Sequence, residues 1–158
     1  PLRELAACAD ILSLHCPLPE ENRHMVNADT IARMKKGVVL INTSRGGLID
    51  SEALVEGIKS RQIGAACLDV YEEEANVFFH DYSGHIVDDD TLARLISMPN
   101  VILTSHQAFL TKEALGNIAQ TTLKNIEDFL QNGMSPNEIC YKCPKVAQCD
   151  QKHGEKCF

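Results

Sequence analysis

The chain has 158 residues, of which 44% are apolar and 5% are aromatic, and it contains no Trp. This length and composition suit one domain with a buried core and argue against a disordered chain. The formal net charge is −7 and no basic run occurs, so we expect no binding to nucleic acid. No apolar stretch reaches the roughly 20 residues of a membrane-spanning helix. No segment resembles a signal peptide, so we expect a cytoplasmic protein without a membrane partner.

Four short apolar runs predict strands, at residues 10–16, 38–41, 65–68 and 101–103. The run 38–41 is rich in β-branched residues and apolar on both faces, which is typical of a strand covered by helices on both sides. The chain begins with Pro1, not Met, and passes at once into the first strand-like segment. We therefore expect it to be the carboxyl-terminal part of a longer protein.

Helix signals lie between these runs. The candidate caps are Asn27 or Asp29 for a first helix and Asp50 or Ser51 for a second. A polar loop spans residues 71–88, and a short helix follows it. The clearest helical period lies at residues 115–130, where one apolar face persists until Gly133. Strands that alternate with helices, without hairpin signals, imply parallel strands with right-handed crossovers and hence an open α/β sheet.

Polar side chains follow three of the predicted strands, and ligands of an open parallel sheet bind beyond the carboxyl ends of its strands. Arg45 follows the second strand, Glu72, Glu73 and Glu74 follow the third, and His106 follows the fourth. An Arg can bind a carboxylate through two hydrogen bonds, and a His can exchange a proton with a substrate oxygen. These residues also have a purely structural interpretation. Arg45 could be a solvated turn residue, the three glutamates a hydrated surface loop, and His106 a half-buried histidine.

Seven cysteines divide the chain into two parts. Cys8, Cys16 and Cys67 lie in or beside apolar segments, where a free thiol acts as a small hydrophobic residue. The other four fall in the last nineteen residues, at Cys140, Cys143, Cys149 and Cys157. Four thiolates could hold zinc or an iron–sulfur cluster, but only one C-x-x-C pair is present. We therefore favour reduced thiols in a flexible tail over a metal site.

Three segments carry more specific motifs: Val-Val-Leu-Ile-Asn-Thr-Ser-Arg-Gly-Gly-Leu-Ile-Asp at 38–50, Gly-Ala-Ala-Cys-Leu-Asp-Val-Tyr-Glu-Glu-Glu at 64–74 and Asn-Val-Ile-Leu-Thr-Ser-His-Gln-Ala at 100–108. In order and spacing they resemble the D-2-hydroxyacid dehydrogenases, and the resemblance covers residues 1 to about 133. Within that family, Phe78-Phe79 and the run at 106–111 resemble the D-lactate dehydrogenases. The Cys-rich segment lies outside the resemblance.

The resemblance implies a domain organisation and a set of ligands. Residues 1–110 would form the carboxyl-terminal half of a doubly wound parallel-sheet (Rossmann) domain that binds NAD. Residues 111–133 would form a long helix that returns to a substrate domain, and residues 134–158 a Cys-rich tail. The implied substrate is a small 2-oxo or 2-hydroxy acid, such as pyruvate or D-lactate, and the implied full-length assembly is a homodimer.

The resemblance also assigns roles by position. Arg45 matches the arginine that binds the substrate carboxylate, His106 the acid/base histidine, and Glu74 the glutamate that pairs with it. Phe109 matches an aromatic position beside the substrate, so the implied substrate pocket comprises Arg45, His106 and Phe109. The positions that line the dinucleotide are Cys16, Pro17, Asn22, Thr43, Ser44, Arg45 and Asp69.

The glycine-rich phosphate loop of the family is missing, because no G-x-G-x-x-G occurs in this chain. The sequence therefore predicts weak dinucleotide binding and no turnover by this chain alone. The alternative is a non-catalytic, dinucleotide-sensing interaction protein on the same scaffold. The presence of Arg45, Glu74 and His106 argues against that alternative.

Overall fold

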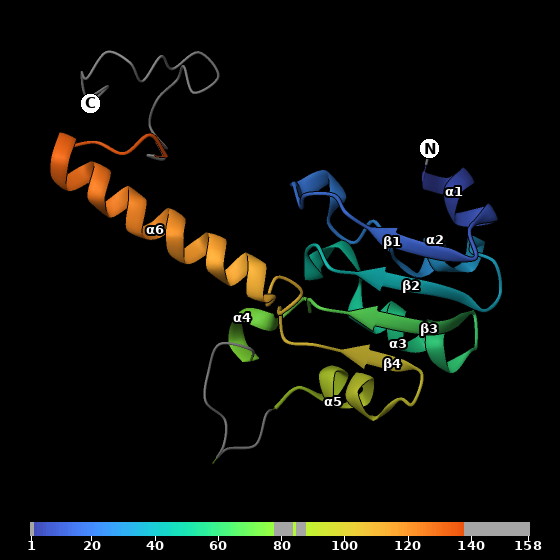
Figure 1. Ribbon diagram of the computed structural model, residues 1–158. Helices are drawn as coiled ribbons and strands as arrows, with labels where there is room; N and C mark the ends of the chain where they lie inside the picture. Colours follow the sequence, from blue (N-terminus) through green and yellow to red (C-terminus); the bar gives the residue numbers. More distant parts are fainter. Residues whose placement is uncertain (1, 78–83, 85–87, 138–158) are drawn as a thin grey trace. The chain divides into compact units, whose positions relative to one another are not determined.

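The computed structural model describes residues 2–77, 84 and 88–137 (Figure 1). The chain divides into two compact units, Pro1–Ala108 and Phe109–Phe158. Among the described residues, the first unit contains the sheet and the second contains one long helix.

The first unit is built on a sheet of four parallel strands. They are β1 (Ile11–Leu14), β2 (Val38–Asn42), β3 (Ile63–Leu68) and β4 (Val101–Leu103). In space they lie in the order of the sequence, β1-β2-β3-β4. The predicted strands and the parallel α/β sheet are therefore confirmed. β1 is shorter than expected at both ends, and β3 begins two residues earlier.

Four α-helices of this unit lie on one face of the sheet (Figure 1). They are α1 (Leu2–Cys8), α2 (Ala28–Arg33), α3 (Ser51–Lys59) and α5 (Asp90–Ser97), and each contacts the next. Right-handed crossovers between strands that follow one another in a single direction place every connecting helix on the same side. Among the described residues, helices therefore cover one face of β2, not both as expected. The presence of α1 also corrects the expectation that the chain enters a strand at once.

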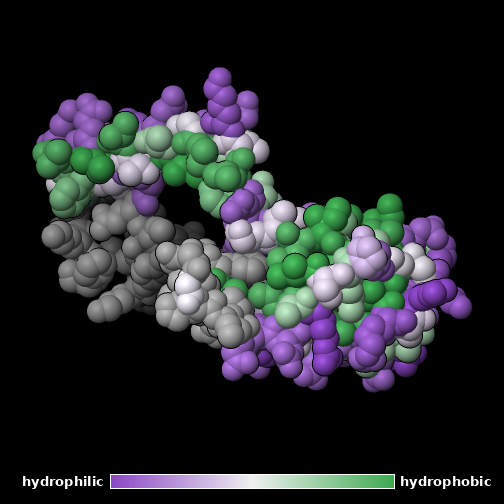
Figure 2. Space-filling view, turned by 90° about the horizontal axis from the view of Figure 1, so that it is seen from below, coloured by the Kyte–Doolittle hydropathy of each residue, from purple (hydrophilic) through white to green (hydrophobic). Residues whose placement is uncertain are grey.

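The two faces of the sheet differ in exposure. Leu40, Ile63 and Ala66 are fully buried beneath the helices. On the other face, Ile11 and Ile102 are 63% and 64% exposed. Figure 2 shows a hydrophobic patch on the surface of this unit beside a hydrophilic one. The core thus lies between the sheet and the helices.

Side-chain caps decide where the helices begin. Asn27 caps α2, because its Oδ1 accepts a hydrogen bond of 3.0 Å from the N–H of Thr30. Asp50 caps α3 through a 3.0 Å bond from the N–H of Ala53. Of the two candidates at each start, the first is therefore the cap, since its backbone is extended and leaves its side chain facing the first turn.

The loop after β3 contains a short helix that the sequence did not predict, α4 (Glu74–Val77). The second unit contains α6 (Lys112–Asn132), which Thr111 caps and Gly133 ends with φ of +70°. This confirms the predicted long helix. Its apolar residues are exposed: Leu115, Ile118, Leu123, Ile126, Phe129 and Leu130. No helix in the described part of the chain is both long and apolar enough to cross a membrane.

Leu40→Ala should lower the free energy of unfolding of this chain by roughly 2–5 kcal/mol, because it leaves a cavity in a fully buried site at the centre of the sheet. Ile102→Ala, on the exposed face, is the matched control and should cost less than about 1 kcal/mol. Urea-unfolding midpoints compare the two variants. Equal losses would contradict this assignment of the faces.

Candidate active site

The turn after β2 carries Arg45 and is closed by a buried asparagine. Asn42, the last residue of β2, is 1% exposed. Its Nδ2 donates to the carbonyl of Arg45 (2.9 Å), and its Oδ1 accepts from the N–H of Ser44 (3.1 Å). The side chain of Arg45 is exposed, and its Nη1 donates to the carbonyl of Ser44 (2.8 Å). The turn therefore fixes the backbone of Arg45 while leaving most of its guanidinium available to a ligand.

Two glycines let this turn pack tightly against its neighbours. Gly46 and Gly47 begin a short 3₁₀ helix, η2 (Gly46–Leu48). A Cβ at Gly46 would lie 2.0 Å from the carbonyl oxygen of Tyr71, and one at Gly47 would lie 2.9 Å from Cδ2 of Leu18. No other residue fits at position 46 without moving the backbone that leaves β3. The turn after β2 and the segment after β3 are thus in direct contact.

His106 pairs with Glu74 across the exits of β4 and β3. Nδ1 of His106 lies 3.0 Å from Oε1 of Glu74, and the two side chains are 32% and 17% exposed. Oε2 of Glu74 accepts a 3.1 Å bond from the N–H of Tyr71, which orients the carboxylate. A carboxylate bonded to Nδ1 fixes the tautomer and the orientation of a histidine ring. The structure therefore brings together the pair that the sequence selected.

Asp69 organises the loop after β4 from within the protein. It is 5% exposed, and its carboxylate accepts bonds from the Thr104 hydroxyl and from the N–H groups of Gln107 and Ala108 (both 2.8 Å). Its carbonyl accepts from the N–H of His106 (2.7 Å). Burial alone would raise the pKa of Asp69. These hydrogen bonds and the nearby His106 outweigh burial and hold the pKa below its usual range.

The residues expected to line the dinucleotide lie at the same edge of the sheet. The hydroxyl of Ser44 donates to the carbonyl of Cys16 (2.5 Å), which joins the exits of β1 and β2. Nδ2 of Asn22 donates to the carbonyl of Pro17 (3.1 Å). Thr43 is exposed. These bonds shape the edge, and the contacts with a dinucleotide stay predictions.

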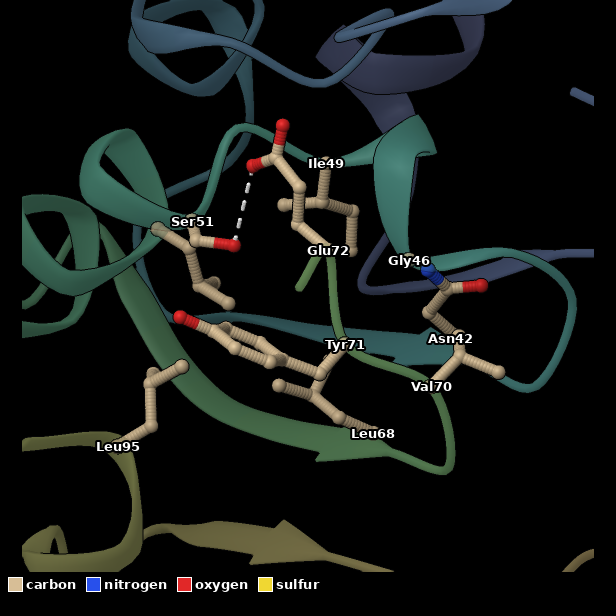
Figure 3. Close-up of a pocket in the computed structure, with 10 residues that line it drawn as sticks. Asn42, Gly46, Ile49, Ser51, Leu68, Val70, Tyr71, Glu72 and Leu95 are labelled. Carbon is tan, nitrogen blue, oxygen red and sulfur yellow. Dashed lines mark hydrogen bonds between the residues drawn. The ribbon is translucent and has the colours of Figure 1, made fainter. Parts of the chain in front are cut away.

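A small pocket lies behind the Arg45 turn (Figure 3). Its lining residues are Asn42, Gly46, Ile49, Ser51, Leu54, Leu68, Val70, Tyr71, Glu72 and Leu95. The hydroxyl of Tyr71 donates to Asp89 (3.0 Å), and burial together with that carboxylate raises the pKa of Tyr71 above its usual range. Arg45, Glu74 and His106 do not line this pocket. We therefore interpret it as part of the supporting interior.

The described contacts do not join all of the predicted site residues to one another. The turn of Arg45 reaches Tyr71, and Tyr71 reaches Glu74, but no described contact joins the Arg45 guanidinium to His106. Phe109 begins the second unit and is 51% exposed, so its contact with a substrate stays a prediction. The four tail cysteines and Phe78-Phe79 lie outside the described residues. Among those that are described, no three metal-binding side chains cluster.

Comparison with known proteins identifies the family of this chain. Residues 1–108 match the model of the D-isomer specific 2-hydroxyacid dehydrogenase, NAD binding domain. The chain belongs to this family. It is 47% identical to 2-hydroxyacid dehydrogenase A of Aspergillus oryzae over 151 residues, which is 96% of this chain and 44% of the relative. It is 48% identical to the D-lactate dehydrogenase of Escherichia coli over 131 residues, 83% of this chain and 40% of that protein.

A solved structure supports the same family. The pyruvate reductase of Chlamydomonas reinhardtii matches with a TM-score of 0.77 and 49% identity, over 82% of this chain and 40% of that one. The chain thus spans less than half the length of each of these three relatives. The match to the Aspergillus protein leaves 4% of the chain uncovered, so the similarity enters residues 134–158, contrary to the expectation that it ends near residue 133.

The lowered pKa of Asp69 gives a pH-dependent prediction. Because its folded pKa lies below the unfolded value of 3.8, the carboxylate stabilises the fold above that value, and the contribution is lost as pH falls through the folded pKa. Asp69→Asn should cost roughly 1–3 kcal/mol at neutral pH, because its amide would face a backbone N–H. The cost should shrink on acidification. Urea unfolding near neutral pH and in acid measures it.

Asp10→Asn is the control for this experiment. Asp10 forms an exposed ion pair with Lys35, so its substitution should change stability by less than about 1 kcal/mol. A cost of Asp69→Asn that stayed constant with pH would contradict the assigned role of the carboxylate.

Proposed function

We propose that this chain supplies the acid/base pair and the carboxylate-binding arginine of an NAD-dependent D-2-hydroxyacid dehydrogenase. The observation that carries the proposal is the 3.0 Å pairing of His106 with Glu74 at the edge of the sheet where the turn of Arg45 also ends. In an open parallel sheet this edge is where ligands bind.

The chemistry follows from the three side chains. Arg45 binds the carboxylate of a 2-oxo acid and stabilises charge that grows on its carbonyl oxygen. His106, charged and held through Nδ1 by Glu74, donates the proton on Nε2 to that oxygen as it becomes an alkoxide. In the reverse direction neutral His106 removes the proton of the 2-hydroxyl group. Glu74 compensates the imidazolium charge in both directions.

The residues at the edge fit a nicotinamide dinucleotide in part. Thr43 and Arg45 are exposed beside the closed turn at the end of β2, and Asn22 lies in the connection after β1, which the Ser44–Cys16 bond joins to that turn. These residues would hold the nicotinamide end of NAD. NADH supplies the hydride when it is bound. The phosphate-binding glycine motif is not in this chain, so tight binding requires further residues.

We assign pyruvate, or a 2-oxo acid of similar size, as the substrate. The relatives named D-lactate dehydrogenase and pyruvate reductase support this choice. Phe109, if it lies beside the substrate as the resemblance implies, would limit the size of the acid. We further propose that the full-length enzyme is a cytoplasmic homodimer.

The roles can be tested in a full-length protein. The segment of the E. coli D-lactate dehydrogenase that matches this chain is replaced by the corresponding segment of this chain. With pyruvate and NADH, His106→Gln should lower kcat by roughly 10²–10⁴-fold because the proton donor is lost. Arg45→Lys should lower kcat/KM by roughly 10–100-fold because the two-bond contact with the carboxylate is lost.

Glu73→Gln is the control, because it removes an exposed negative charge one residue from Glu74 and should leave kcat/KM within about two-fold. An active fusion whose His106 and Arg45 variants keep the parental kcat/KM would refute these roles. A fusion that binds NADH but reduces no 2-oxo acid would favour the dinucleotide sensor.

The isolated chain should bind NADH weakly and show no turnover. Its sequence has no glycine-rich phosphate motif, and it spans 40% of the E. coli relative. Fluorescence titration with NADH should give a Kd at least about 100-fold higher than that of the fusion, because contacts with the phosphates are missing. Pyruvate reduction by the isolated chain at a rate near that of the fusion would contradict this prediction.

A further inference from the structure

The carboxylate of Glu72 joins three separate connections of the sheet. Its side chain is 15% exposed, and Oε1 lies 2.5 Å from Nε2 of His24 and 3.1 Å from Nη2 of Arg23. Oε2 accepts from the hydroxyl of Ser51 (3.4 Å), the bond drawn in Figure 3. Arg23 and His24 follow β1, Ser51 begins α3 after β2, and Glu72 follows β3. Its neighbour Glu73 is exposed.

The backbone of His24 holds one side of the Arg45 turn. Its N–H donates to the carbonyl of Gly47 (2.8 Å), and the N–H of Val26 donates to the carbonyl of Leu48 (3.0 Å). The carbonyl of Val26 accepts from the N–H of Asp50 (3.0 Å). His24 adopts a left-handed backbone with φ of +51°, which a non-glycine residue rarely adopts unless its surroundings hold it there. Residues 24–26 therefore pair with the chain directly after Arg45.

The other side of the turn lies against Glu72 itself. A Cβ at Gly46 would lie 2.0 Å from the carbonyl oxygen of Tyr71 and 2.5 Å from the backbone nitrogen of Glu72. The turn is thus held between residues 24–26 on one side and residues 71–72 on the other. The His24–Glu72 pair connects these two sides, so the turn has little freedom to move while the pair is intact.

We propose that Glu72 and His24 are positioning residues for Arg45. This inference rests on the proposed function, in which Arg45 binds the substrate carboxylate. Neither side chain needs to touch the substrate. Loss of the pair lets the turn shift, and a shift of the guanidinium weakens its two-bond contact with the acid. The effect therefore falls mainly on binding of the 2-oxo acid, which depends on the guanidinium, and less on binding of NADH, which the fusion also holds through its phosphate-binding residues.

Kinetic measurements on the full-length fusion test whether Glu72 and His24 affect substrate binding. Glu72→Ala and His24→Ala should each raise KM for pyruvate about five-fold or more while the Kd for NADH stays within about two-fold. The double variant should be no worse than Glu72→Ala alone, because Glu72→Ala already removes the interaction with His24. Glu73→Ala, the matched control, should keep the parental KM.

A background without the guanidinium separates positioning from a general loss of structure. In Arg45→Ala, adding Glu72→Ala should raise KM by less than about two-fold, because the group being positioned is gone. A further loss as large as that in the parent would overturn the inference. So would an equal increase in the Kd for NADH.

Hydrogen exchange of the 158-residue chain tests the restraint without any assay of activity. Glu72→Ala should speed exchange of the His24, Val26 and Asp50 amides about ten-fold or more, while Ala66 within β3 stays as slow as in the parent. Unchanged exchange at the three amides would overturn the inference. Faster exchange combined with an inactive parental fusion would overturn the proposed function but support the restraint of the turn.

Discussion

The Arg45 turn touches the backbone of Tyr71 so closely that only glycine fits at position 46. The rest of the candidate site depends on this contact, because it sets the distance between the exits of β2 and β3. From Tyr71 the connection continues through its N–H to Glu74 and from Glu74 to His106. Side chains that are 29 and 61 positions from Arg45 in the sequence are therefore related to its turn by a short series of contacts.

The acidic residues near the site form hydrogen bonds and ion pairs with different partners. Asp69 is satisfied by donors from its own loop, Glu74 faces His106, and Glu72 faces His24 and Arg23. Each carboxylate thus has donors of its own, which offsets the cost of burying negative charge. The edge of the sheet can hold several carboxylates and still present the exposed cation of Arg45 to an anion.

Much of the fold could be predicted from the sequence, because strands, caps and the final helix depend on local patterns. Asn27 and Asp50 were each one of two candidates, and only the backbone conformation separates them from Asp29 and Ser51. The covering of one face of the sheet follows from strand order, which apolar runs do not encode. The α4 helix is one turn long and has no apolar period to reveal it.

The candidate site likewise contains residues that could be predicted from the sequence and residues that could not. Arg45, Glu74 and His106 could be selected by motif, and the structure pairs two of them. The supporting residues could not be predicted from the sequence. Asn42 follows the predicted strand 38–41, but its closing of the turn depends on contacts that the sequence does not show. His24 and Glu72 are 48 positions apart, and neither the spacing nor the composition of the chain predicts that they meet.

The backbone of His106 itself carries a consequence for how the site tolerates change. With φ of +54° it occupies a region that costs an ordinary residue roughly 1 kcal/mol, and glycine would relieve that cost. The same conformation turns successive N–H groups toward Asp69, so the loop is shaped by main-chain atoms that every substitution at this position except proline retains. A glycine at position 106 would relieve the strain but would lose the imidazole that pairs with Glu74, so the cost of the left-handed backbone comes together with that pair.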